Sequence, residues 1–175
     1  MDQRVMVFID GSNLFWACRA QKFKIDLKKL VDELVNGRSL LRPCYYCATP
    51  ENPDQRQMNF HRMLKYLGFR VVPKTLKSRL DKNGKEIYVE KGVDVALVTE
   101  MLSMAFKNAY DVAILVAGDD DYVGAVEEIK SMGKRVEIAA FERDLDKKVN
   151  LISADLKMSA DLFTPLEQIK DKIKR

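Results

Sequence analysis

The chain has little of the residues on which several classes of protein depend. Its 175 residues include three cysteines and a single histidine, His61. An odd number of cysteines argues against a disulfide-stabilised scaffold. One histidine makes most zinc sites, and mechanisms of the Ser-His-Asp or Cys-His type, hard to build. Any chemistry must therefore depend mainly on carboxylates, lysines and hydroxyl groups.

Long apolar runs are also absent. The longest, Val112–Ala117, is far shorter than the roughly 20 residues that a membrane-spanning helix needs. The first apolar run, Val5–Ile9, is too short for the core of a signal peptide and ends at an aspartate. We therefore expect a cytoplasmic protein without a membrane segment.

The charge balance is mildly basic. Lysine and arginine number 30 against 26 aspartates and glutamates, a formal net charge of +4. Such a surplus permits a polyanionic partner but does not require one. With 47% hydrophobic and 32% charged residues, the composition is that of a globular domain.

Apolar segments of strand length alternate along the chain with segments of helical spacing. The predicted strands are Val5–Ile9, Pro43–Ala48, Phe69–Val72, Val112–Val116 and Val136–Ala140. Helices are expected near residues 12–35, 54–67, 92–108 and 120–132. Strands that are apolar throughout and separated by helices predict a three-layer α/β/α fold with a mostly parallel sheet of about five strands.

Two further segments complete the predicted organisation. Residues 74–90 indicate a small β-hairpin, because Asp81-Lys82-Asn83-Gly84 has the composition of a tight turn. Residues 165–175 are expected to form a short basic helix. The remainder, residues 1–164, is interpreted as a single domain.

Acidic residues follow two of the predicted strands at the point where each strand ends. Asp10 follows the first strand, and Asp119 follows the fourth within Gly118-Asp119-Asp120-Asp121. Ligands of parallel sheets bind beyond the carboxyl ends of the strands, so these side chains are expected at a ligand site. Helix capping explains Asp10 and Asp119 poorly, because both come directly off buried strands.

A further aspartate, Asp94, is expected in the first turn of the long helix at 92–108. It has two interpretations, a favourable charge near the helix N-terminus or a member of the acidic site. Neighbouring aspartates repel one another, and a cation would relieve that repulsion. Hard oxygen ligands without histidine suit Mg²⁺ or Mn²⁺, which can activate water for attack on phosphorus.

Three motifs in this order resemble the NYN group of the PIN-like nuclease superfamily, in particular its LabA-like branch. They are Phe8-Ile9-Asp10-Gly11-Ser12-Asn13, Lys91-Gly92-Val93-Asp94-Val95 and Ala117-Gly118-Asp119-Asp120-Asp121-Tyr122, with a weaker match at Ser159-Ala160-Asp161-Leu162-Phe163. The resemblance implies a parallel sheet with the first and fourth strands adjacent. It also implies metal-dependent cleavage of RNA by residues at the edge of that sheet.

The same resemblance assigns roles to individual residues. Asp10, Asp94, Asp119 and Asp121 would form a catalytic, metal-binding cluster. Asn13 would position Asp10 or a metal-bound water, with Ser12 assisting. The chain departs from the usual pattern at Asp120, where a serine is common, and at Tyr122, where phenylalanine is frequent. The additional acid leaves open which carboxylates bind metal.

Basic residues gather between the third predicted strand and the long helix. They are Lys74, Lys77, Arg79, Lys82, Lys85 and Lys91. One interpretation is a clamp for the phosphate backbone of RNA beside the acidic site, in which Lys91 offsets the charge of the scissile phosphate. The other interpretation is a solvated hairpin with no ligand.

Two functions remain open from the sequence. The first is a divalent-metal-dependent ribonuclease, and the second is a non-catalytic RNA-binding or regulatory module that keeps the fold. A phosphotransferase of the haloacid-dehalogenase type is disfavoured, because Ser12 stands where that family needs a second aspartate. Trp16 is expected in the core or at a homodimer contact, with stacking on RNA as the alternative. His61 is expected at the surface, and Glu100 on a solvated helix face, with a secondary acid of the site as the alternative for Glu100.

Overall fold

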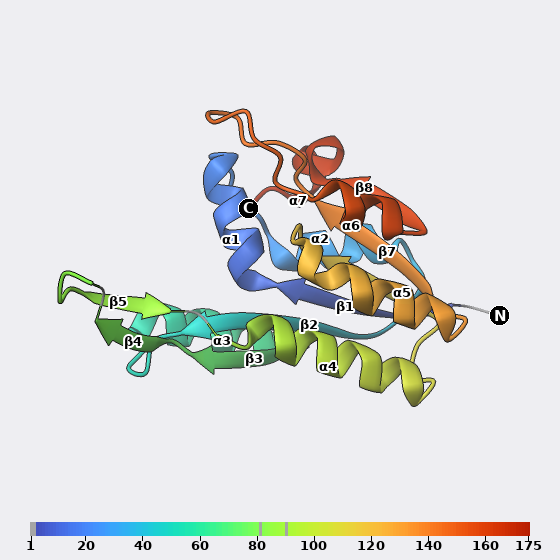
Figure 1. Ribbon diagram of the computed structural model, residues 1–175. Coiled ribbons are helices and arrows are strands. Elements are labelled where there is room, and N and C mark those ends of the chain that lie inside the picture. Colours follow the sequence, from blue (N-terminus) through green and yellow to red (C-terminus); the bar gives the residue numbers. More distant parts are fainter. Residues whose placement is uncertain (1–2, 81, 90) are drawn as a thin grey trace.

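The computed structural model describes residues 3–80, 82–89 and 91–175 and is shown in Figure 1. Its centre is a six-stranded sheet in the order β3-β2-β1-β6-β7-β8, with every neighbouring pair parallel. The strands are β1 (Arg4–Asp10), β2 (Ser39–Thr49), β3 (Arg70–Thr75), β6 (Val112–Val116), β7 (Arg135–Ala140) and β8 (Leu162–Pro165). The predicted mostly parallel α/β fold is confirmed.

Helices cover both faces of the sheet. One face carries α1 (Gly11–Ala20), α2 (Leu27–Val35), α3 (Gln55–Tyr66) and α7 (Lys170–Ile173). The other carries α4 (Val93–Phe106), α5 (Val123–Ser131) and α6 (Ala154–Ser159). Asp26 and Asp54 cap α2 and α3 by accepting hydrogen bonds from backbone N–H groups of the first turn, which is why these helices begin where they do.

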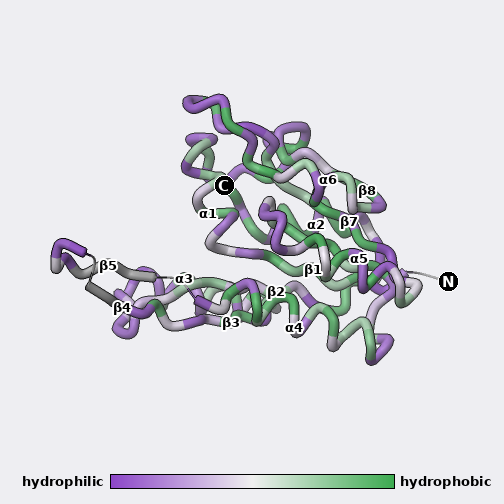
Figure 2. Tube along the Cα trace, viewed as in Figure 1, coloured by the Kyte–Doolittle hydropathy of each residue, from purple (hydrophilic) through white to green (hydrophobic). Residues whose placement is uncertain are grey.

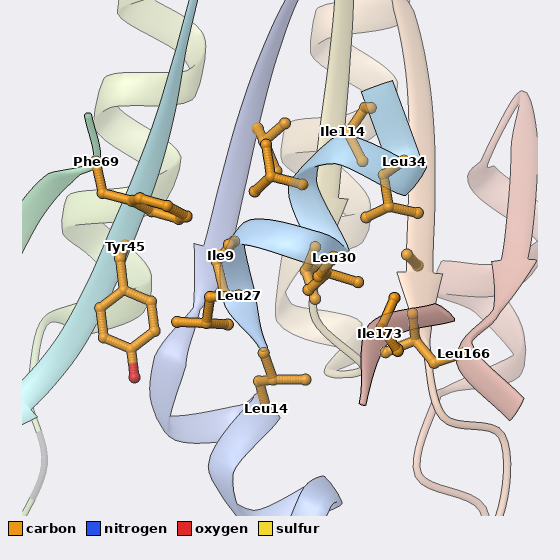
Figure 3. Close-up of a cluster of buried hydrophobic side chains, with 14 of the residues drawn as sticks. Ile9, Leu14, Leu27, Leu30, Leu34, Tyr45, Phe69, Ile114, Leu166 and Ile173 are labelled. Atoms are coloured by element: carbon orange, nitrogen blue, oxygen red, sulfur yellow. The ribbon is translucent and has the colours of Figure 1, made fainter. Parts of the chain in front are cut away.

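The alternation of side chains along β1 separates two hydrophobic cores. Val7 and Ile9 belong to the core beneath α1 and α2, whereas Met6 and Phe8 belong to the core beneath α4 and α5. Figure 3 shows side chains of the first core that come from α1, α2, α7 and the strands of the sheet. Because both faces are covered, the apolar residues of β1 and β6 are buried without exception.

The predicted hairpin is present beside the main sheet. Strands β4 (Lys77–Leu80) and β5 (Glu86–Val89) pair antiparallel as a separate two-stranded sheet. It projects beyond the carboxyl ends of β2 and β3, and its tip is strongly hydrophilic in Figure 2. The N–H of Leu76 donates to the carbonyl of Thr49, which holds the start of the hairpin to β2. Asp81 of the predicted turn lies outside the described residues.

Three elements differ from the sequence expectations. The sheet has a sixth strand, β8, which has only four residues and includes Pro165. The helix expected at 120–132 begins with a 3₁₀ turn, η1 (Asp120–Tyr122), before α5. The segment 165–175 forms a 3₁₀ turn, η2 (Leu166–Ile169), followed by α7 rather than one helix.

The C-terminal segment packs on the rest of the chain. Leu166 and Ile173 are buried in the core beneath α1 and α2. The division into a domain at 1–164 and a tail at 165–175 stays a prediction. No helix within the described part of the chain is both long and apolar enough to cross a membrane.

Candidate active site

The pairing of β1 with β6 brings the two acidic motifs to the same end of the sheet. We call this end, where the parallel strands terminate, the carboxyl edge, and the opposite end the amino edge. Ile9 lies opposite Val116, so Asp10 and Asp119 leave neighbouring strands at their carboxyl ends. Each of the two aspartates has a glycine next to it in the sequence, and both glycines are closely surrounded by other groups. A Cβ on Gly11 would lie 2.4 Å from the ring of Tyr45, and a Cβ on Gly118 would lie 2.0 Å from the carbonyl oxygen of Leu151. A glycine therefore follows Asp10 and precedes Asp119 because neighbouring groups leave no room for a side chain.

Asp10 is held by two hydrogen bonds and is only 5% exposed. Its Oδ1 accepts from the N–H of Asn13 at 3.0 Å, and its Oδ2 accepts from the hydroxyl of Tyr122 at 2.7 Å. Asp10 is therefore the N-cap of α1, and the expectation that capping would not explain it was wrong. The strand enters the helix without an intervening loop, so one carboxylate both ends β1 and caps α1.

Tyr122 is the central residue that the sequence interpretation did not assign. It is buried, and burial raises its pKa well above the usual value, with further increases from Asp10, Asp119 and Asp94. The phenol therefore stays protonated and donates to Asp10. Asp10 contacts the Tyr122 hydroxyl directly, whereas the charges of Asp119 and Asp94 act on it through space. The only sequence signal was its departure from the phenylalanine that is frequent at this position.

Asp119 immediately precedes η1, and its side chain is exposed to solvent. Partial burial of its carboxylate raises its pKa above the usual value, and the charge of Asp10 raises it further. A hydrogen bond from Asn13 opposes this rise. Asn13 also accepts from the N–H of Gly118 at 3.1 Å through its Oδ1. The side chain of Asn13 thus positions Asp119, whereas only its backbone contacts Asp10.

The remaining acidic residues lie at the rim of the site. Asp94 is exposed in the first turn of α4, and Asp120 and Asp121 are exposed in η1. The charges of Asp121 and Asp120 add to the rise in the pKa of Asp119. Among the side chains that the structure describes, no lysine or arginine forms an ion pair with any of these aspartates.

The chemistry of the site suits a hard divalent cation, although a full ligand cage is not assembled. Within the described part of the chain, no three His, Cys, Asp or Glu side chains are grouped closely enough to hold a metal ion. Mg²⁺ is commonly bound by one or two carboxylates, with water and substrate phosphate completing its ligands. Asp10 and Asp119 fit that smaller requirement, because they are adjacent, like-charged and unpaired with a cation. The four-aspartate cluster stays a prediction.

The predicted basic residues lie on or beside the hairpin. Lys77, Lys82, Lys85 and Lys91 are exposed, whereas Lys74 is half-buried on β3. The backbone of Arg79 pairs with Ile87, but its side chain lies outside the described residues. The hairpin and the aspartates share the carboxyl edge of the sheet, since β3 leads into β4 and residue 91 leads into α4.

Two side chains expected elsewhere have different positions. Glu100 accepts a hydrogen bond from the hydroxyl of Tyr46 at 2.9 Å and pairs with Arg70, so it is not on a solvated helix face. Trp16 is 62% exposed, which excludes the core position among its expected places, whereas the homodimer contact and stacking on RNA stay predictions. Ser12 is half-buried, and its Oγ accepts from the N–H of Ala48 at 3.4 Å. Cys44 and Cys47 face opposite cores, as the strand period predicts.

Two hollows adjoin this edge. One, of about 320 Å³, lies beside Asp119 and is lined by Gly118, Asp120 and the segment 150–154. The second, of about 560 Å³, lies between α1, β2 and α3. We call this second hollow the aromatic cleft, because its lining includes Phe15, Trp16, Tyr45 and Phe60.

Comparison with known proteins agrees with the fold and shows the family. The model of the NYN domain matches residues 4–167, and the chain belongs to this family. It is 26% identical over 173 residues to the low amplitude and bright protein LabA of Synechococcus elongatus, covering 98% of this chain and 88% of that one. This likeness agrees with the LabA-like branch.

A solved structure confirms the architecture. A protein of unknown function from Vibrio parahaemolyticus superposes with a TM-score of 0.78 at 24% identity. The match covers 99% of this chain and 97% of that chain. At this identity the likeness supports the fold alone.

Proposed function

We propose that the protein is a divalent-metal-dependent ribonuclease, a hydrolase of RNA phosphodiester bonds. The observation that carries the proposal is that Asp10 and Asp119 leave neighbouring parallel strands at their carboxyl ends and have no cationic partner among the described side chains. Membership of the NYN domain family supports a nuclease-type function related to RNA. The mildly basic chain and the hairpin support a polyanionic substrate.

Asp10 and Asp119 are the proposed ligands of Mg²⁺ or Mn²⁺. When bound, such an ion lowers the pKa of a water molecule and offsets charge on the phosphate. Tyr122 fixes the orientation of Asp10 through its hydroxyl, and Asn13 fixes Asp119 through its amide. Asp94 and Asp121 lie at the rim, where they would accept a proton or hold water near the phosphate. Asp120 adds negative charge to the same rim.

The basic residues of the hairpin are the proposed contacts of the RNA backbone. Lys77, Lys82 and Lys91 are exposed on the side of the sheet where the aspartates lie. Their positive charge would offset the repulsion between an acidic site and a polyanion. Lys74, Arg79 and Lys85 are assigned to the same surface from the sequence. A cytoplasmic location and a homodimer remain part of this proposal.

The proposal is tested by incubating single-stranded RNA with the protein in Mn²⁺, in Mg²⁺ or in EDTA. We expect cleavage only with a divalent ion, and a loss of at least about 100-fold in the Asp10→Asn variant, since losing a metal ligand should cost at least as much as losing a residue that only orients one, which costs about 10- to 100-fold. Asp171→Asn, an exposed aspartate of α7, is the matched control and should cleave like the parent. Equal cleavage by Asp10→Asn would overturn the assignment.

The second candidate is a non-catalytic RNA-binding module. It is favoured by one specific observation, that both oxygens of Asp10 already accept hydrogen bonds from the protein. In that case RNA binds to the parent and to Asp10→Asn alike, and no divalent ion produces cleavage. The same assay therefore separates the two functions.

A further inference from the structure

The aromatic cleft is a second concave site beside the acidic edge. Its volume of about 560 Å³ lies within the usual range for small-molecule sites. The residues that begin α1 connect the two places directly, because Gly11 and Ser12 line the cleft and follow Asp10 in the chain. A ligand in the cleft therefore contacts the two residues that follow Asp10, the carboxylate proposed to bind metal.

Aromatic rings form a large part of the cleft. Phe15 and Trp16 are 55% and 62% exposed, and their ring centroids are 5.5 Å apart in an edge-to-face arrangement. On the other side, Phe60 packs edge-to-face on Tyr45 with centroids 5.8 Å apart. Two adjacent exposed aromatic side chains on the first helix are unusual for a soluble surface, and flat rings of this kind stack well on nucleobases.

Polar groups in the same cleft could read the edge of a flat heterocycle. The lining includes the hydroxyl of Ser12, the amide of Gln57 and the imidazole of His61. His61 is held by a contact of 3.4 Å between its Nε2 and the Sγ of Cys47. Burial, followed by the charge of Lys65, lowers the pKa of His61, so the ring is neutral near pH 7 and has one donor and one acceptor.

Charge next to the aromatic pair also suits a nucleotide. The guanidinium of Arg19 lies 5.3 Å from the ring centroid of Trp16 and 5.8 Å from that of Phe15. An arginine over two exposed rings presents a cation for a phosphate beside a surface for a base. No carboxylate side chain is among the described residues that line the cleft.

We propose that the aromatic cleft is a nucleobase subsite, which holds one base of a single-stranded RNA while the adjoining phosphate lies at Asp10 and Asp119. The proposal rests on the proposed function only in taking RNA as the ligand. A flat aromatic ligand explains the exposed rings, the neutral hydrogen-bonding groups and the adjacent cation together. It also explains why Trp16 is exposed rather than buried in the core.

The experiment uses Trp16 as its own probe, because it is the only tryptophan of the chain. Single-stranded octa-adenylate is titrated into the intact protein in EDTA, so that no cleavage occurs. We expect the tryptophan fluorescence to be quenched in a saturable way. An abasic octamer with the same number of phosphates should leave the fluorescence unchanged and bind at least about fivefold more weakly, the lower bound for one stacked base.

Variants locate the base. Phe15→Ala should weaken binding of fluorescently labelled octa-adenylate at least about fivefold, measured by anisotropy. Phe106→Ala is the matched control, because Phe106 is also exposed, at 83%, but ends α4 at the opposite edge of the sheet. Equal affinity for the two octamers, or equal affinity of the Phe15 and Phe106 variants, would overturn the subsite.

A second measurement separates this subsite from a contact between copies of the chain. If Phe15→Ala changes the sedimentation of the protein from dimer to monomer and leaves the RNA affinity intact, the surface binds a second copy and the proposal fails. Failure of the ribonuclease assignment is distinguishable, because binding in EDTA needs no cleavage. The converse result is also distinguishable. If Asp10→Asn loses cleavage but octa-adenylate does not quench the tryptophan fluorescence of the parent, the nuclease assignment stands and only the subsite is rejected.

Discussion

The amino and carboxyl edges of the central sheet differ in whether their acidic side chains form ion pairs. At the amino edge, Glu137 is paired with Arg38 through two contacts of 2.9 Å and with Arg135 through a third. Asp111 is paired with Arg4 at 2.7 Å. At the carboxyl edge, Asp10 and Asp119 have no cationic partner among the described side chains, although they are adjacent.

The pKa shifts follow this difference. The hydrogen bonds from Arg4 hold the pKa of Asp111 well below its usual value. Burial alone would raise the pKa of Glu137, but hydrogen bonds from Arg38 and Arg135 outweigh burial and lower it. Asp119 shifts upward instead, through burial and the charge of Asp10. Paired carboxylates at one edge stabilise the fold, whereas the ionised carboxylate of Asp119 at the other costs stability and has no cationic partner among the described side chains.

The largest expected effect on stability is at the amino edge. Glu137→Gln leaves Arg38 partly buried beside a neutral side chain, and should lower the free energy of unfolding by about 3 kcal/mol at pH 7. Because the pKa of Glu137 is lowered by folding, its stabilisation is complete above the ordinary value of 4.5 and disappears as the pH falls through the folded value. Urea unfolding at pH 7 and at pH 3 measures both.

The control for that prediction is Glu127→Gln, on the exposed side of α5. It should change stability by less than about 0.5 kcal/mol, as surface substitutions generally do. If the two variants unfold alike, the amino edge contributes no more than an ordinary surface, and the contrast between the edges disappears.

Tyr122→Phe should have a smaller effect, at the carboxyl edge. It removes the hydroxyl that donates to the buried Oδ2 of Asp10, and should lower stability in EDTA by about 1 to 2 kcal/mol. Mn²⁺ should recover part of the loss, because the freed oxygen can contact the ion. Chemical unfolding with and without Mn²⁺ is the measurement. Tyr66→Phe, at an 84% exposed tyrosine, should be indistinguishable from the parent.

Asp119→Asn should stabilise the metal-free protein slightly, by less than about 1 kcal/mol, because the site is partly exposed to solvent. The folded pKa is raised, so ionisation of Asp119 opposes folding. This opposition grows as the pH rises from the ordinary value of 3.8 to the folded value and is constant above it. Unfolding curves against pH should show a gain at neutral pH that vanishes in acid. A loss at neutral pH would identify a structural aspartate.

The basic hairpin should affect RNA and leave stability unchanged. Replacing Lys77, Lys82 and Lys91 with glutamine should flatten the dependence of log affinity on log salt by roughly two units, about 0.7 for each phosphate contact. Filter binding of single-stranded RNA at several salt concentrations measures the slope. The charge-matched control replaces Lys65, Lys107 and Lys134 near the amino edge. Equal slopes for the two triple variants would make the hairpin a solvated arm.

Much of the fold could be predicted from the sequence, because the signals are local. The strand Val112–Val116 has the predicted bounds, since a continuous apolar run lies between Asp111 and the segment Ala117-Gly118-Asp119. Asp26 and Asp54 are residues that often precede a helix, and their side chains cap the first turns of α2 and α3. Strand β8 was missed because it is the outermost strand and has only four residues including a proline, too few to show a continuous apolar run.

The site was less predictable, because its contacts join residues far apart in the chain. Asp10 and Tyr122 are 112 residues apart, and nothing local shows that the phenol reaches the carboxylate. The resemblance linked Asn13 to Asp10, but in the structure its backbone N–H bonds Asp10 whereas its side chain bonds Asp119. The exposure of Trp16 depends on how α1 leaves β1, and a helical pattern of apolar residues does not determine that.

The central claim is that the unpaired carboxylates of the carboxyl edge bind a divalent cation. The most direct test is thermal unfolding of the parent, Asp119→Asn and Glu137→Gln in millimolar Mn²⁺ and in EDTA, since an ion that binds only the folded state raises the melting temperature. We predict that Mn²⁺ raises the melting temperature of the parent and of the less stable Glu137→Gln, and that Asp119→Asn loses most of this rise. A parent indifferent to Mn²⁺, or a full rise in Asp119→Asn, would contradict the account.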